Sequence, residues 1–353
     1  MDYIELLRSL IRIPSLSRQE DATASLLFER FRAEGLEPRR HGNNVWCVQG
    51  NMDISKPTLL LNSHHDTVRP SSSYTRDPYS PTLENGRLYG LGSNDAGASA
   101  VSLAEIFSRF RDKDLKYNLI LAITAEEEVT GEGGMRSFLP HLTREGYHVD
   151  MALVGEPTGM QPAIAERGLV VLDCISHGIT GHAARNEGVN AIYKAINDIE
   201  KLRSFKFPRE SEVLGPIGIQ VTQIEAGRQH NVIPEECRWV VDIRTTDAYS
   251  NEETVAILRE HVEADVTPRS TRVRASVIDR DHPLVKAATM SGGTPFVSPT
   301  TSDMSQMSAF PSLKMGPGDS ARSHSADEYI LISEIESAIE IYSNFLNNLN
   351  TIL

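Results

Sequence analysis

Four short apolar runs, each ending in polar residues able to bind a metal, restrict the fold more than any other feature of this chain. In the first half, helical apolar spacing near residues 2–11 and from about Asp21 to Glu34 alternates with strand patterns, which is typical of an α/β sheet. Because ligands of open α/β sheets bind beyond the carboxyl ends of the strands, we expect a functional site where the runs end. The runs are residues 57–64, 118–124, 151–154 and 313–315, and their polar ends read SHHD, AEEE, GEPT and GPGDSARSH.

The sequence pattern changes from about Gly168 to Ile278, which predicts a second domain. Strand and helix patterns there follow the order βαββαβ, typical of a small ferredoxin-like fold. A chain of 353 residues is also longer than one core usually accommodates. We therefore predict a discontinuous catalytic domain, residues 1–167 and 280–353, interrupted by an inserted domain over residues 168–279.

Composition and charge argue against two classes of function. The 48 acidic and 35 basic residues give a net charge of -13, and the sequence has no basic stripe with interleaved aromatic residues, so we expect no nucleic-acid partner. The longest apolar runs are far too short to cross a membrane, and the acidic N-terminus argues against a signal peptide, so we expect a cytoplasmic protein. Cys47, Cys174 and Cys237 lie in apolar, strand-like stretches, which predicts reduced core residues.

The first polar end combines two histidines and an aspartate. Residues two apart in an extended segment point the same way, so His64 and Asp66 can share a face, whereas His65 should point elsewhere. A carboxylate beside a metal-binding imidazole can fix its tautomer and raise its basicity. On its own, however, a His-x-Asp pattern is most often structural.

Acidic residues elsewhere are further candidates for metal binding. The adjacent charges of Glu126, Glu127 and Glu128 would repel one another unless a cation or a proton intervened, although a solvated acidic loop explains the triplet equally well. Asp95 precedes a helical stretch, where an isolated aspartate is by default a helix N-cap. The GxG pattern before it has Asp95 in place of the third glycine of a dinucleotide fingerprint, which disfavours a phosphate site.

Together these motifs resemble the M20 metallopeptidase and deacylase family, which includes acetylornithine deacetylase and succinyl-diaminopimelate desuccinylase. The resemblance covers essentially the whole chain, although many relatives have a lysine shortly after the aspartate and this chain reads Ala-Gly-Ala-Ser there. The five matching motifs are H-x-D-[TV]-V at His64 to Val68, G-x-G-x-x-D at Gly90 to Asp95, D/E-E-E at Glu126 to Glu128, V-G-E-P-T at Val154 to Thr158, and G-P-G with a later histidine at Gly316 to Gly318 and His324.

The resemblance implies a zinc-peptidase-like α/β catalytic domain with a mixed central sheet, and an inserted domain that acts as a lid and dimerises. It also implies two divalent metal ions, Zn²⁺ first with Co²⁺ or Mn²⁺ as alternatives, and a cis peptide after the bridging aspartate. The roles it implies are one metal on His64 and Glu156, a second on Glu128 and His324, Asp95 bridging both, Glu127 as general base and Asp66 as the partner of His64.

Residues outside the metal centre are assigned by the same resemblance. His182 is expected to reach the site of a second copy in a homodimer and to stabilise the tetrahedral oxyanion. Asn231 and Arg244 are expected to contact substrate; without the resemblance, Arg244 reads as an ordinary salt-bridge residue at a strand end. Thr301 and Gly318 are further candidate substrate contacts.

The leading hypothesis is a co-catalytic metal-dependent amidohydrolase that acts on a small N-acyl amino acid through a two-metal-activated water, with Glu127 as general base. The expected substrate is N-acetylornithine, or N-acetyl- or N-succinyl-citrulline, in arginine biosynthesis. A dipeptidase or aminopeptidase of the same family is one alternative. The aminopeptidase branch is disfavoured because position 156 is a glutamate rather than an aspartate. A catalytically silent binding homologue is another, and it predicts the loss of a ligand or of the base, none of which is missing.

Overall fold

The computed structural model describes residues 2–50, 52–185 and 187–353, and the chain divides into two compact units. The first unit contains Met1–Ile164, Ile278–Val297 and Ser302–Leu353. The second contains Ala165–Val277 and Ser298–Thr301, so it interrupts the first in sequence. Each unit has hydrophobic core clusters of its own.

The first unit is built on a mixed sheet with the strand order β1-β2-β6-β3-β7-β17-β8. The four strands β6, β3, β7 and β17 run parallel, and β2 and β8 flank them in the antiparallel sense, which confirms the predicted mixed sheet. The bounds are β1 (Arg39–His41), β2 (Asn44–Val48), β3 (Thr58–His64), β6 (Asn118–Thr124), β7 (Met151–Val154), β8 (Ala163–Glu166) and β17 (Ser312–Lys314), with β16 (Phe296–Ser298) also on β8 and β15 (Ser276–Val277) paired with Ala165 and Glu166.

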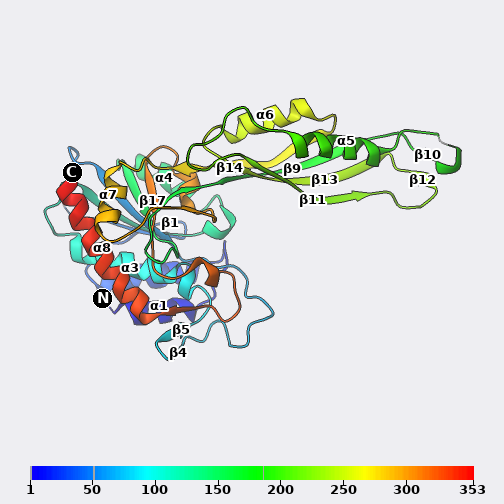
Figure 1. Ribbon diagram of the computed structural model, residues 1–353. Coiled ribbons are helices and arrows are strands. Elements are labelled where there is room, and N and C mark those ends of the chain that lie inside the picture. The colour runs from blue at the N-terminus through cyan, green and yellow to red at the C-terminus, as the bar shows by residue number, and fades with distance from the viewer. Residues whose placement is uncertain (1, 51, 186) are drawn as a thin grey trace. The chain divides into compact units, whose positions relative to one another are not determined.

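Both faces of this sheet are buried, as the apolar runs predicted. In β3, Leu59 and Leu61 pack into the larger core, whereas Leu60 packs into a second core on the other face. Figure 1 shows α8 running alongside α3 on the side of the larger core. The helices are α1 (Tyr3–Ile11), α2 (Asp21–Ala33), α3 (Ala98–Phe110), α7 (Pro283–Met290) and α8 (Ile332–Ile352) for the larger core and α4 (Met135–Arg144) for the other.

The first unit also contains several short elements. A π-helical turn, η1 (Ser93–Gly97), precedes α3, and a 3₁₀ turn, η2 (Glu127–Val129), follows β6. A small antiparallel sheet is formed by β4 (Thr82–Glu84), β5 (Arg87–Tyr89) and β18 (Tyr329–Leu331). Two more 3₁₀ turns, η4 (Asp303–Gln306) and η5 (Ser320–Arg322), lie in the C-terminal part of the chain.

The second unit has the order βαββαβ that the sequence predicted. Its antiparallel sheet, in the order β11-β13-β9-β14, has α5 and α6 packed against it (Figure 1). Residues along β9 alternate between buried and half-buried, because only one face joins the core. The bounds are β9 (Gly168–His177), α5 (Ala191–Ser204), β11 (Gly218–Ala226), β13 (Glu236–Thr245), α6 (Asn251–His261) and β14 (Asp265–Val273), with β10 (Gly181–His182) and β12 (Val232–Ile233) as a separate pair and η3 (Ala183–Arg185) after β10.

Two findings bear on the expectations from composition. Within the described part of the chain, no helix combines the length and the apolar character needed to cross a membrane. Cys47, Cys174 and Cys237 are all free and buried, as predicted for core residues.

Candidate metal centre

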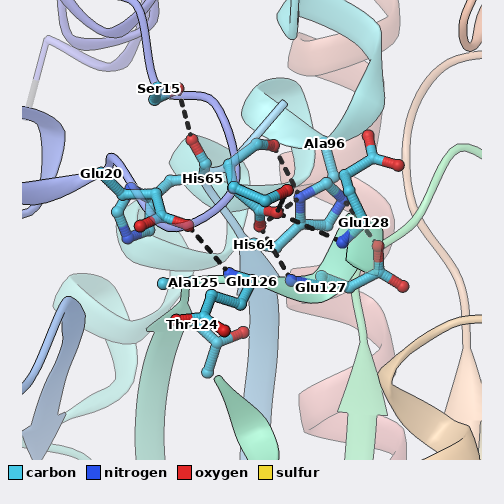
Figure 2. Close-up of polar contacts among 12 residues, drawn as sticks. Ser15, Glu20, His64, His65, Ala96, Thr124, Ala125, Glu126, Glu127 and Glu128 are labelled. Atoms are coloured by element: carbon cyan, nitrogen blue, oxygen red, sulfur yellow. Dashed lines mark hydrogen bonds and ion pairs between the residues drawn. The ribbon is translucent and has the colours of Figure 1, made fainter. Parts of the chain in front are cut away.

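Four groups of the site lie at or just after the carboxyl ends of three adjacent parallel strands, β6, β3 and β7. His64 is the last residue of β3, Glu127 and Glu128 follow β6 in η2, and Glu156 follows β7. Since β6, β3, β7 and β17 are neighbours and parallel, their carboxyl ends lie at the same edge of the sheet. Figure 2 shows His64 close to Glu127 and Glu128 at this edge.

His64 lies at the centre of a buried group of carboxylates. Its Nε2 atom is 3.2 Å from Oδ1 of Asp95, 3.7 Å from Oε1 of Glu156 and 3.9 Å from Oε2 of Glu127. The imidazole is 1% exposed. Among the described residues, two sets of three side chains have ligand atoms within 4.8 Å of one another: His64 with Asp95 and Glu128, and His64 with Glu127 and Glu156.

Asp95 connects this group to a second histidine. Its Oδ1 atom faces His64, whereas its Oδ2 atom is 3.7 Å from Nε2 of His324. The same Nε2 atom is 2.9 Å from Oε2 of Glu128. The two oxygens of one carboxylate therefore face two different imidazoles, which is the arrangement that a bridging ligand needs. The peptide bond between Asp95 and Ala96 is cis, as expected.

Asp66 holds several parts of the site at once. Its carboxylate accepts hydrogen bonds from the backbone N–H groups of Glu127 (3.0 Å) and Glu128 (3.2 Å) and from the hydroxyl of Ser17 (2.7 Å). The Nδ1 atom of His64 is 3.0 Å from the Asp66 carbonyl oxygen and 3.4 Å from its carboxylate. Burial disfavours a charged imidazole, but the carboxylates of Asp66, Asp95, Glu127 and Glu156 together outweigh burial and raise the pKa of His64 well above its ordinary value.

The carboxylates of the site are buried with too few cations to balance them. Burial raises the pKa of Glu156 to about 8, raises that of Glu128, and raises that of Glu127 well above its ordinary value. Oε1 of Glu156 is buried and has no hydrogen-bond partner among the described residues. A buried carboxylate oxygen that accepts no hydrogen bond is costly unless a cation is near it. The donor set of oxygens and imidazoles, without a thiolate, therefore fits a pair of divalent cations.

Two neighbours of these residues point away, as the sequence pattern predicted for His65. His65 contacts the Thr23 hydroxyl through Nδ1 (2.9 Å) and the Asn43 carbonyl through Nε2 (3.0 Å), and burial lowers its pKa to about 4. The carboxylate of Glu126 instead accepts a hydrogen bond from the backbone N–H of Gly133 at 3.2 Å. Only the second and third glutamates of the triplet therefore face the site.

Sequence reasoning missed two buried acidic residues beside the site. Asp303 accepts a hydrogen bond from the Thr124 hydroxyl at 2.9 Å, and burial raises its pKa to about 6. Glu328 is 2% exposed, and burial raises its pKa to about 8. The only sequence signals are their positions, one at the end of the SPTTSD loop and the other four residues after His324.

The remaining candidate substrate residues, apart from Gly318, lie in the second unit. His182 is an exposed residue of β10, and its Nδ1 atom accepts a hydrogen bond from the N–H of Ala184 at 3.2 Å. The Arg244 guanidinium makes a bidentate contact with the carboxylate of Asp242, at 2.8 and 3.1 Å. Asn231 is exposed and accepts a backbone hydrogen bond from Ala183, and the Thr301 hydroxyl donates to the Arg167 carbonyl at 3.3 Å.

Gly318 belongs to the first unit and has a clear conformational requirement. Its φ of +91° is in the left-handed region, and a Cβ atom there would overlap Oδ1 of Asn94. Its carbonyl accepts a hydrogen bond from Gly159 at 2.7 Å. These contacts explain why a glycine stands here, and its contact with substrate stays a prediction.

Comparisons with known proteins agree with this geometry. The sequence model described as "Peptidase family M20/M25/M40" matches residues 60–348. A succinyl-diaminopimelate desuccinylase from Paracoccus denitrificans (strain Pd 1222) is 31% identical over 281 residues, covering 74% of this chain and 72% of the relative. A second protein of that name, from Halorhodospira halophila (strain DSM 244 / SL1), is 27% identical over 386 residues and covers 98% of each chain.

Solved structures share the fold at lower sequence identity. A tripeptidase from Staphylococcus aureus superposes with a TM-score of 0.78 at 21% identity, covering 99% of this chain and 98% of the other. A Bacillus subtilis protein described as a dinuclear metal binding peptidase from the M20 family superposes with a TM-score of 0.71 at 17% identity, covering 99% and 97%. The agreement confirms the predicted fold class.

Proposed function

The chain belongs to the peptidase family M20/M25/M40, whose members are metal-dependent amide hydrolases, and from that premise we propose that it hydrolyses the amide bond of a small N-acyl amino acid. One observation carries the proposal. Asp95 places one carboxylate oxygen near His64 and the other near His324, and Glu127 lies beside them on the same edge of the sheet.

We assign two divalent ions to this arrangement. When bound, they supply Lewis acidity that polarises the amide carbonyl and makes water a stronger acid. Zn²⁺ is our first choice, with Co²⁺ or Mn²⁺ as alternatives, because imidazole and carboxylate ligands suit all three. The ligands would be His64 and Glu156 for one ion, Glu128 and His324 for the other, and Asp95 for both.

Glu127 is the proposed general base. It takes a proton from the attacking water and returns it to the leaving nitrogen. Burial disfavours its charged form and raises its pKa, an effect that two divalent cations bound beside it would oppose. Its backbone is fixed by Asp66, so the carboxyl group is carried on a restrained turn.

The relatives modify the expected substrate. Both named above are succinyl-diaminopimelate desuccinylases, which favours an N-succinyl amino acid and a role in lysine rather than arginine biosynthesis. N-acetylornithine and the N-acyl citrullines remain candidates of the same chemical class. Arg244 has the planar fork that binds a carboxylate in two places, and it already holds the Asp242 carboxylate in that way. A substrate carboxylate would have to replace or share that partner.

A homodimer through the second unit is part of the proposal. Side chains of α5 and β11 expose apolar surface that a partner could cover: Tyr193 is 67%, Ile196 45% and Ile224 54% exposed. β11 is also an edge strand of its sheet, with unpaired backbone groups on one side. In such a dimer, His182 would act in the site of a second copy.

The test is amine release by the Zn²⁺-loaded or Co²⁺-loaded protein from a matched panel. The panel contains N-succinyl and N-acetyl forms of diaminopimelate, ornithine and citrulline, together with dipeptides. Turnover of one N-acyl amino acid that a chelator abolishes would support the proposal and identify the substrate. Turnover of dipeptides alone would favour the peptidase alternative. If two ions are bound and no amide is hydrolysed, the silent-homologue alternative would replace it.

A further inference from the structure

Glu328 makes hydrogen bonds with the backbone of the segment that carries Asp95. Its Oε1 atom accepts hydrogen bonds from the backbone N–H groups of Asn94 (2.8 Å) and Asp95 (2.9 Å), and its Oε2 atom accepts one from Gly92 (3.1 Å). The Glu328 carbonyl also accepts a hydrogen bond from Gly90 at 2.9 Å. One buried side chain therefore accepts hydrogen bonds from the backbone N–H groups of Gly92, Asn94 and Asp95, at the start of η1.

Asn94 ties the same loop to the segment that precedes His324. Its side chain is fully buried, its Nδ2 donates to the Asp319 carbonyl (3.1 Å), and its Oδ1 accepts from the Asp319 N–H (3.0 Å). Nδ2 is also 3.4 Å from the hydroxyl of Ser323, the residue before His324. These contacts join backbone segments that are 225 residues apart in the chain.

The two side chains act on opposite ends of one short segment. Residues 319–328 are bound at the first end by Asn94 and at the last end through Glu328, and His324 lies between these ends. The Glu328 end is anchored further because the next residues form β18, which pairs with β5. We call Asn94 and Glu328 the clasp.

We propose that the clasp sets the distance between Asp95 and His324 and thereby the affinity for the second ion, the one assigned to Asp95, Glu128 and His324. Asn94 and Glu328 are positioning residues that act through the ligands, and this inference rests on the proposed function. The other ion keeps His64 and Glu156. The His64 imidazole makes hydrogen bonds with Asp66 and Asp95, and of these two residues Asp95 is the one that Glu328 contacts.

Substitutions can open the clasp at either end. Asn94→Ala removes the contacts with Asp319 and Ser323 but leaves the backbone N–H that Glu328 binds. Glu328→Ala removes all three acceptor contacts. Glu328→Gln is nearly isosteric and keeps one acceptor oxygen, but its NH₂ group would face an N–H donor, so its effect should be intermediate.

Asn118, the first residue of β6, provides a matched control. Asn118 is 1% exposed, its Nδ2 donates to the carbonyls of Asp53 (2.9 Å) and Lys56 (3.0 Å), and its Oδ1 accepts from the Asp53 N–H (2.9 Å). It is the same kind of loop tie as Asn94, at the amino end of a strand whose carboxyl end carries the site. Asn118→Ala should therefore lower the melting temperature without changing metal binding.

The experiment is calorimetric titration of the chelator-stripped full chain with Zn²⁺, together with a melting curve of each variant. We expect two ions in the wild type and in Asn118→Ala. We take the second ion as the weaker one, because the His324 side chain is 55% exposed and that of His64 is 1% exposed. In Asn94→Ala and Glu328→Ala, the affinity for this ion should fall by about 10- to 100-fold, with a smaller loss in Glu328→Gln. The tighter ion should be retained in all of them.

The outcomes separate this inference from the proposed function. Two ions with wild-type affinities in every clasp variant, including the conservative Glu328→Gln, would overturn the role of the clasp and leave the proposed function intact. A loss of the weaker ion in Asn118→Ala as large as in Asn94→Ala would also overturn it, because any destabilised loop would then suffice. A wild-type chain that binds fewer than two ions would overturn both.

Discussion

The Asp66 carboxylate accepts a hydrogen bond from the backbone N–H of Glu127 at 3.0 Å. Asp66, which follows β3, therefore fixes the turn η2, which follows β6. From the sequence, Asp66 is expected only to be the partner of His64. The structure adds a second role, because the turn with the proposed base and a proposed ligand is held by the same carboxylate. Substitution here should therefore affect chemistry and metal binding together.

We expect Asp66→Asn to lower kcat/KM by about 10- to 100-fold and to weaken metal binding as well. The amide has one acceptor oxygen, whereas the carboxylate now uses both oxygens for Glu127, Glu128 and Ser17. Steady-state kinetics and metal content measure the two effects. Wild-type values for both would show that the turn does not depend on this carboxylate.

Glu127→Gln should reduce turnover by about 10²- to 10⁴-fold while both ions stay bound, because the amide cannot carry the proton. The matched control is Glu126→Gln, since the Glu126 carboxylate binds the Gly133 N–H instead of facing His64. The control should keep most of its turnover. Equal losses in the two variants would assign the base to another residue.

His324→Ala should lose one of the two ions together with activity, since the Nε2 atom lies 2.9 Å from Glu128 and 3.7 Å from Asp95. His282→Ala is the control, because that imidazole accepts a hydrogen bond from Leu284 at the N-terminus of α7. Elemental analysis of the dialysed proteins gives the ion count. Two ions in His324→Ala would remove this histidine from the ligand set.

The three cysteines should not react with a thiol reagent at about pH 8 while the chain is folded. Burial raises the pKa of Cys47 and of Cys174 to about 12 and raises that of Cys237, so the reactive thiolate is scarce at this pH. All three should react once denaturant unfolds the chain. A thiol that reacts in the native protein at the rate of a free cysteine would contradict the buried positions.

Local patterns were enough to predict much of the fold and of the candidate site. Strands such as Asn118–Thr124 are apolar throughout because both faces are buried, and this signal does not depend on distant residues. The opposite directions of His64 and His65 follow from the alternation of side chains along an extended segment. The βαββαβ order of the second unit could also be predicted, because each of its strands and helices has a local pattern of apolar residues.

The clasp could not be predicted in this way. Asn94 lies in the short turn η1 and Glu328 lies just before β18, and in such connecting segments a solvent-exposed polar side chain is the ordinary expectation. Their burial arises from contacts between segments more than 200 residues apart, and neither residue stands in a periodic pattern. By contrast, the bidentate contact of Arg244 with Asp242 is of a kind that local spacing can predict, since residues two apart on a strand share a face.

Gly318→Ala should destabilise the fold and lower the affinity for the second ion, for two separable reasons. A side chain at a φ of +91° costs about 1 kcal/mol or more, and here the added Cβ would also push against Asn94 and open the clasp. Gly292→Ala isolates the first effect, because Gly292 has a φ of +95° and a Cβ there would meet no atom within 4 Å. Both variants should melt at a lower temperature than the wild type. The free energy of unfolding of Gly318→Ala should be lower than that of Gly292→Ala by roughly a further 1 to 3 kcal/mol. Only Gly318→Ala should lose affinity for the weaker Zn²⁺ ion. If the two variants bind Zn²⁺ alike, contact between residue 318 and Asn94 does not influence the metal centre.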